Sequence, residues 1–125
     1  MITFELAKQL KDARYRTDGY VLGHTFYPHP SSPGWSKEAR EAGVIIDQYV
    51  LANHLADLNE GYCVPTLEEL ITACGDKFDS LKHINGHWFA NWDISNQPRD
   101  VKGSTAEEAV ARLWLALHAN GDASA

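Results

Sequence analysis

The spacing of apolar and polar positions predicts α-helices near both ends of the chain. In residues 3–13 apolar side chains recur every three or four positions, and Thr3 stands before them as a candidate N-cap. Near the C-terminus, Thr105 and Glu108 have the spacing of a capping box, in which each side chain satisfies a free backbone N–H at the helix start. An apolar stripe continues through residues 109–117, which supports a long final helix.

Two more helical regions are predicted in the middle of the chain. Thr66 and Glu69 repeat the capping-box spacing, so we expect a helix to begin there. Ser36 is a candidate N-cap for an earlier helix. An internal glycine and the β-branched run after it leave residues 43–58 open between one helix and a short strand followed by a helix. Gly61 fits a left-handed end for this region.

Residues 78–93 have the pattern of a β-hairpin. Asn85-Gly86 separates two runs of strand-forming residues, and this pair suits a type I′ turn because both of its positions adopt a positive φ. We therefore predict an α+β fold, with a small antiparallel sheet built on the 78–93 hairpin and packed against three or four helices. The polar stretch that follows, which contains Pro98 and Gly103, is expected to be a loop.

The region from residue 15 to residue 35 is expected to be a long irregular loop, rich in proline and glycine. Three prolines within six residues remove backbone donors and favour extended conformations, and residues 20–22 form the only short strand expected there. Long ordered loops often carry function. We expect residues 1–125 to form a single domain, with a frayed tail at 122–125.

Composition places the chain among ordinary globular proteins. Its 125 residues are 44% hydrophobic and 22% charged, and no apolar run is long enough to span a membrane. The first residues lack the basic start and apolar stretch of a secretory signal. These features predict a cytoplasmic location, in which Cys63 and Cys74 stay reduced.

The acidic residues are unevenly distributed. The formal net charge is −6, and residues 43–76 contain no lysine or arginine. Nucleic-acid binding needs clustered basic side chains, so we expect no direct contact with nucleic acid. The segment either faces a basic protein partner or forms solvated helix surfaces. Its six acids are Asp47, Asp57, Glu60, Glu68, Glu69 and Asp76.

His24 and His29, on the proline-rich loop, are candidate metal ligands. A third ligand would have to come from Cys63, His54 or Asp57. Zinc sites use three or four ligands with characteristic spacings, and neither Cys-x-x-Cys nor His-Glu-x-x-His occurs in the chain. We therefore predict no metal, no cofactor and no catalytic residues. A small metal-dependent hydrolase that uses the His24/His29 loop is the enzymatic alternative.

Two other pairs that contain histidine are interpreted structurally. His54 and Asp57 are three residues apart in a predicted helix and fit an exposed side-chain pair. His83 and His87 flank the hairpin turn, and we expect them to lie near each other across the strands.

The aromatic residues of the hairpin are the candidate binding residues. Trp88, Phe89 and Trp92 cannot all face one side of a strand, because successive side chains alternate. At least one of them stays at the surface unless another strand, or the loop that contains Trp35, covers it. Exposed aromatic side chains rimmed by polar groups mark interaction sites. Trp35, Trp88, Phe89 and Trp92 are therefore the predicted partner-binding residues.

Residues 64–78 and 103–117 resemble segments of small uncharacterised tailed-phage and prophage proteins, and residues 6–13 fit the same group. The segments include Pro-Thr-Leu-Glu-Glu-Leu-Ile and Ser-Thr-Ala-Glu-Glu-Ala-Val-Ala-Arg-Leu-Trp-Leu-Ala-Leu. The resemblance implies a phage or prophage origin and a bacterial host cell. It carries no assigned activity, so it transfers no functional residue.

The succession of residues 88–92 and 103–109 is also similar to HicB-type antitoxins, in which an aromatic strand leads to a Gly-x-Thr-x-Glu-Glu-Ala helix. That resemblance implies an inhibitor of a small toxin, although the chain has no evident DNA-binding appendage. Our prediction is a non-enzymatic phage or prophage accessory protein that binds another protein or itself. An antitoxin-like inhibitor and the metal-dependent hydrolase are the alternatives.

Overall fold

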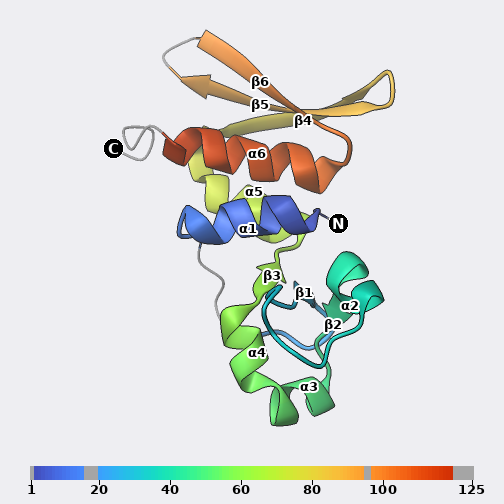
Figure 1. Cartoon of the computed structure of the whole chain (residues 1–125). Coiled ribbons are helices and arrows are strands. Elements are labelled where there is room, and N and C mark those ends of the chain that lie inside the picture. Colours follow the sequence, from blue (N-terminus) through green and yellow to red (C-terminus); the bar gives the residue numbers. More distant parts are fainter. Residues whose placement is uncertain (1, 16–19, 95–96, 120–125) are drawn as a thin grey trace.

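A computed structural model describes residues 2–15, 20–94 and 97–119. In these residues the chain forms two three-stranded antiparallel sheets (Figure 1). Sheet A has the strand order β2-β1-β3, and sheet B has the order β4-β5-β6. The elements are α1 (Phe4–Asp12), β1 (Thr25–Tyr27), α2 (Lys37–Ala42), β2 (Val44–Ile45), α3 (Gln48–Asn53), α4 (Leu55–Glu60), β3 (Tyr62–Val64), α5 (Leu67–Cys74), a 3₁₀ turn (Gly75–Lys77), β4 (Phe78–Ile84), β5 (His87–Ile94), β6 (Gln97–Gly103) and α6 (Ala106–Ala119).

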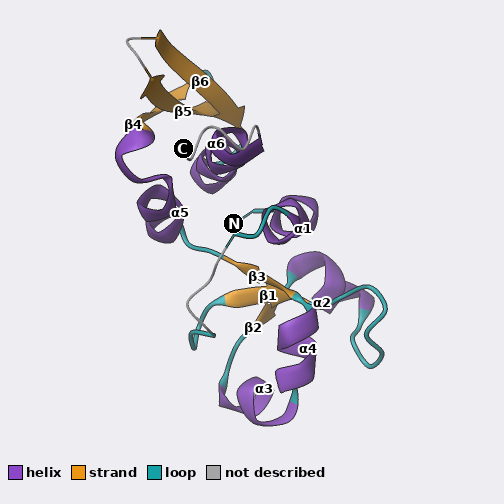
Figure 2. Cartoon of the chain, turned by 90° about the vertical axis from the view of Figure 1, so that its left-hand side faces the viewer, coloured by secondary structure: helices purple, strands orange, loops and turns teal. Residues whose placement is uncertain are grey.

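Sheet B and helices α1, α5 and α6 form a large lobe, and sheet A with α2, α3 and α4 forms a small lobe (Figure 2). Helix α6 packs on one face of sheet B, and α5 and α1 pack on α6. Trp88, Ala90 and Trp92 of β5 face this helix layer. There they pack in one core with buried residues of α6, among them Val110 and Leu113. The main core therefore lies between sheet B and its helices.

Sheet A connects the two lobes, because side chains on its two faces pack into two different hydrophobic cores. Phe26 points into a small core with Ile46, Val50 and Leu58. Its neighbour Tyr27 points the other way, into the main core, where its hydroxyl donates a hydrogen bond to the carbonyl of Ile2 at 2.7 Å. The alternation of side chains along a strand thus places adjacent residues in separate cores.

The predicted helix starts are confirmed. The Thr3 and Ser36 side chains accept hydrogen bonds from backbone N–H groups in the first turns of α1 and α2. Thr66 and Glu69 form both bonds of a capping box. At α6, the Thr105 hydroxyl accepts from the N–H of Glu108 as expected, but the Glu108 carboxylate accepts from Ser104 instead of Thr105.

The hairpin prediction is also confirmed. Strands β4 and β5 pair through Asn85-Gly86, where both residues have positive φ values of 52° and 80°. For residues 43–58, the structure selects the strand-plus-helix alternative: β2 comes first, followed by the short helices α3 and α4. The α+β class is therefore as predicted, although the second sheet was not foreseen.

Three local predictions are wrong. The stretch with Pro98 and Gly103 is strand β6, not a loop; a proline is compatible with an edge strand, because one side of its backbone has no neighbouring strand. The strand expected at residues 20–22 lies at Thr25–Tyr27 instead, inside the region expected to be irregular. Gly61 is not left-handed, since its φ is −80°.

The absence of a side chain at Gly61 has a packing reason. A Cβ there would lie 2.7 Å from the carbonyl oxygen of Tyr27 and 2.9 Å from that of Asp57. The glycine thus allows α4 to end tightly against β1. The turn expected at residues 16–19 and the frayed tail at 122–125 lie outside the described residues.

Candidate functional site

Three of the four aromatic residues predicted to bind a partner pack within the fold. Trp92 is buried in the main core, and Trp88 is half-buried against it, with the His83 ring stacked at 4.6 Å between centroids. Trp35 covers the small core, with its ring centroid 5.6 Å from that of Phe26. Phe89 is the exception, because alternation along β5 places it on the outer face of sheet B, opposite α6.

The outer face of sheet B is uncovered in the described structure (Figures 1 and 2). Phe89 lies at its centre, paired with Lys82 on β4 and with Lys102 on β6. In the next pair toward the turn, Ile84 is 50% exposed and stands opposite His87. This face therefore presents an aromatic ring between two lysines.

Of the large apolar side chains exposed in the described residues, most lie in the small lobe. Ile45 on β2, Tyr49 on α3 and Leu55 on α4 are 64%, 66% and 51% exposed. Val21 and Leu22, in the turn before β1, are 45% and 52% exposed, and the N–H of Gly23 in this turn donates to the Ile46 carbonyl at 2.8 Å. We call Val21, Leu22, Ile45, Tyr49 and Leu55 the small-lobe apolar residues.

Acidic side chains lie on or beside α3 and α4, the helices that carry Tyr49 and Leu55. Asp47 caps α3 by accepting a hydrogen bond from the N–H of Val50. Asp57 pairs with His54 at 3.0 Å as predicted, but His54 lies between α3 and α4 and the pair is partly buried instead of exposed within one helix. The bases of this lobe lie on α2. There, Arg40 donates to the carbonyls of Pro30 and Ser32, and Lys37 forms an exposed ion pair. Helices α3 and α4 thus contain no lysine or arginine of their own, and the nearest cation at the end of α4 is the Lys11 ammonium of α1.

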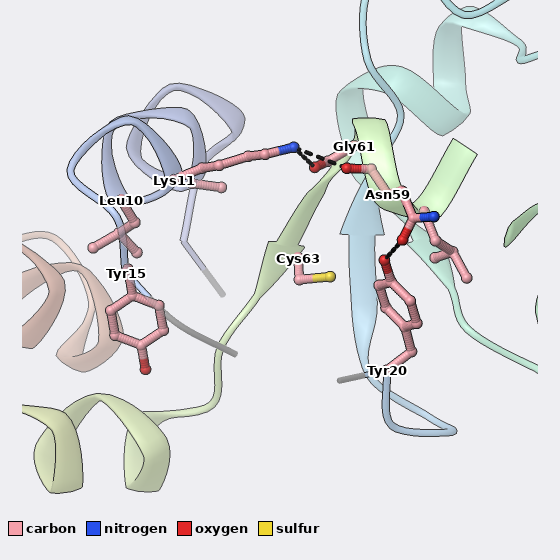
Figure 3. A pocket seen from close by; sticks show the side chains of 9 residues that line it. Leu10, Lys11, Tyr15, Tyr20, Asn59, Gly61 and Cys63 are labelled. Atoms are coloured by element: carbon pink, nitrogen blue, oxygen red, sulfur yellow. Dashed lines mark hydrogen bonds between the residues drawn. The ribbon is translucent and has the colours of Figure 1, made fainter. Parts of the chain in front are cut away.

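A cavity of about 150 Å³ lies where the two lobes meet (Figure 3). The Lys11 ammonium reaches across this junction and donates to the carbonyls of Asn59, Glu60 and Gly61, at 3.2, 3.2 and 2.8 Å. The Tyr20 hydroxyl donates to the side-chain oxygen of Asn59. Lys11 thus caps the C-terminal end of α4, where the free carbonyls and the helix dipole favour a cation.

Cys63 lines this cavity, and its sulfur points toward Tyr20 in Figure 3. Burial raises the pKa of the Cys63 thiol, the Lys11 charge lowers it, and the Glu69 carboxylate raises it further. His24, which lies 3.7 Å from Glu69, also borders a small depression that Cys63 lines. No hydrogen bond joins the thiol to His24 in the part of the chain that is described. The thiol is therefore protonated at neutral pH and lacks the paired base that activates a nucleophile.

Sequence reasoning did not bring Lys11, Tyr20, Asn59 and Cys63 together, because they come from α1, the segment before β1, α4 and β3. Lys82 could have been placed beside Phe89 from the sequence, since a two-residue turn at Asn85-Gly86 sets the register of the hairpin. Lys102 could not, because its strand was expected to be a loop.

The structure does not bring His24 and His29 together. They precede and follow β1, and His29 is held by Ser31, which bonds its Nδ1 through both the hydroxyl, at 2.6 Å, and the backbone N–H. Among the described residues, no group of three or more histidine, cysteine, aspartate or glutamate side chains is arranged to hold a metal ion. His83 and His87 also lie on opposite faces of sheet B, so the expectation that they are neighbours is wrong.

Comparisons of the chain with protein-family models, with curated proteins and with solved structures find no match. Within the described residues, none of the helices has the length and apolar character needed to cross a membrane.

Proposed function

We propose that the protein is a non-enzymatic binding module that docks a basic partner protein on its small-lobe apolar residues. The observation that carries this proposal is the exposure of Ile45, Tyr49 and Leu55, since more than half of each residue's surface is in solvent. A group of large exposed apolar side chains rimmed by polar groups is typical of an interaction surface. In line with the phage-like segments of the sequence, the proposed setting is an accessory protein in the cytoplasm of a bacterial host.

The acidic character of this surface supports a partner with basic residues. Asp47, Asp57 and Glu60 lie on or beside α3 and α4, and residues 43–76 contain no lysine or arginine. Opposite charges across an interface speed association and select the partner, while buried apolar and aromatic anchors supply most of the affinity. Tyr49 has the character of such an anchor, because it combines a large apolar ring with a hydroxyl.

An antitoxin-like inhibitor is the second candidate. A small basic toxin has the charge that this acidic surface selects, and a compact acidic module could cover the toxin's basic surface. The catalytic alternative has no comparable support, because His24 and His29 have separate surroundings and the Cys63 thiol lacks a base.

The test is to co-express the chain with the products of its neighbouring genes and to measure the affinity of any protein that co-purifies in stoichiometric amounts. We expect a basic protein, bound less tightly at high salt. Tyr49→Ala and Leu55→Ala should each weaken binding about 30-fold or more if they are anchors. Alanine favours helices, so neither change should disturb α3 or α4.

Ile84→Ala is the matched control, because Ile84 is an equally exposed apolar residue on the hairpin, away from the small lobe. The Ile84→Ala variant should bind the partner with the same affinity as the wild-type protein. An acidic or absent partner, or equal losses from Ile84→Ala and Tyr49→Ala, would contradict the proposal.

A further inference from the structure

We propose that the outer face of sheet B is a second docking surface, which binds an acidic segment of another protein through Lys82, Phe89 and Lys102. The inference goes beyond the proposed function, because it concerns the other lobe and a ligand of opposite charge. Phe89 of the central strand β5 pairs with Lys82 on one side and with Lys102 on the other.

The position of Phe89 is not explained by the core. The inner face of β5 already supplies Trp88, Ala90 and Trp92 to the main core, and Phe89 points away from it. The ring is half-buried, while the flanking Lys82 and Lys102 are exposed. Long lysine stems can cover apolar surface while their ammonium groups stay in water. An aromatic ring flanked in this way offers an apolar contact between two cations.

The described side chains leave Lys82 and Lys102 without an ion pair, although Asp100 stands on the same face, two residues before Lys102. Lys37 and Arg112, elsewhere in the chain, do form ion pairs. Neighbouring strands are about 4.8 Å apart, so the two lysines project from points about 10 Å apart. A ligand that matches this arrangement carries carboxylates on both sides of one apolar side chain.

The charges favour an acidic peptide over a second copy of the chain. In a symmetric face-to-face dimer centred on Phe89, a lysine of one copy would meet a lysine of the other, and like charges oppose such pairing. A nucleic acid is also disfavoured. The two lysines around Phe89 are too few for a phosphate backbone, because its binding relies on many basic groups that release counterions.

The test uses the full chain labelled with ¹⁵N and three probes. The first is a nine-residue peptide, Ser-Glu-Glu-Ser-Leu-Ser-Glu-Glu-Ser. The second is the same peptide with glutamine in place of glutamate, and the third is a twelve-nucleotide oligo(dT). We expect the acidic peptide to shift the amide resonances of β4, β5 and β6 around Phe89, with an affinity that falls as salt is added. The glutamine peptide should bind about tenfold more weakly or not at all.

Variants connect the binding to the side chains. The double change Lys82→Gln and Lys102→Gln should weaken binding of the acidic peptide about tenfold, and Phe89→Thr should weaken it to a similar degree. Threonine is a strand former, so the sheet should persist. Lys8→Gln, an exposed lysine on α1, is the control for net charge and should leave the affinity unchanged.

Four results would overturn the inference: no resonance shift with millimolar acidic peptide, equal binding of the glutamine peptide, tighter binding of oligo(dT), or equal effects of Lys8→Gln and the double lysine variant. The partner test of the small lobe uses Tyr49 and Leu55, so either proposal can fail while the other stands.

Discussion

Gly103 shows how one residue without a side chain brings two elements together. It ends β6 opposite Trp88, at the point where the chain turns into α6. A Cβ at this position would lie 2.4 Å from the backbone nitrogen of Ala109 and 2.8 Å from its Cα. Both are backbone atoms of α6, which cannot move aside as the end of a side chain can. The glycine thus sets how closely the helix approaches the sheet.

We predict that Gly103→Ala destabilises the protein by about 3 kcal/mol, because overpacking a tight contact forces the backbone to shift. Gly23→Ala is the comparison. Gly23 has a φ of +90° but open space around it, so only backbone strain of about 1 kcal/mol opposes the change. Urea unfolding of the two variants measures both losses. Equal losses would mean that the contact with Ala109 is not tight.

At the scale of single elements, the two capping boxes differ in their partners. The Glu69 carboxylate accepts a hydrogen bond from the N–H of Thr66. The Glu108 carboxylate instead accepts hydrogen bonds from the hydroxyl and the N–H of Ser104, and it forms an ion pair with Arg112 at 2.7 Å. The hydrogen bond from the Ser104 hydroxyl is the main cause that lowers the pKa of Glu108. Partial burial opposes it, while the Ser104 N–H and the Arg112 charge add to it. The charged carboxylate therefore stabilises the start of α6.

This lowered pKa gives a pH-dependent prediction. Because folding favours the ionised form of Glu108, its contribution is complete above the pKa of an unfolded glutamate, about 4.3. It is lost as the pH falls through the lower pKa of the folded state. Glu108→Gln should thus cost about 1 kcal/mol at pH 7, and the difference from the wild-type protein should shrink below pH 4.

Urea unfolding at pH 7, 5, 4 and 3 measures this difference. Glu5→Gln is the control, because Glu5 is an exposed first-turn residue of α1 whose carboxylate accepts no hydrogen bond in the described structure. Its effect should be small at each pH. A Glu108→Gln difference that is unchanged at pH 3 would contradict the assignment.

At the scale of the whole molecule, the lobes have unequal cores. The main core joins α1, α5, α6 and sheet B with residues of sheet A, whereas the buried part of the small core consists of Phe26, Ile46, Val50 and Leu58. Local opening is easiest where few apolar contacts hold a region. The small lobe, which carries the proposed docking surface for a basic partner, should therefore open more readily than sheet B.

Native-state hydrogen exchange tests this difference. We expect the amides of β1, β2 and α3 to exchange at a lower opening free energy than those of β4 and β5. Ile46→Ala should speed exchange mainly in the small lobe. Leu113→Ala should lower the stability of both lobes by about 3 kcal/mol, because Leu113 is fully buried in the main core. Equal protection in the two lobes, or a uniform effect of Ile46→Ala, would contradict this prediction.

The features that the sequence by itself determined are those made by residues close together along the chain. A capping box joins Thr66 to Glu69 across three positions, and the Asn85-Gly86 turn needs only two residues that tolerate positive φ. The sequence also showed that the hairpin aromatic residues could not all share one face. The structure then identified Phe89 as the outward one.

Contacts between distant segments were decided only by the tertiary structure. Strand β6 reads as a polar loop because its strand character depends on pairing with β5, and the pairing of β1 with both β2 and β3 has no local signal. The approach of Lys11 to the end of α4 joins residues about fifty positions apart. The same holds for the two proposed surfaces, since a side chain's exposure depends on which remote elements pack over it and which leave it uncovered.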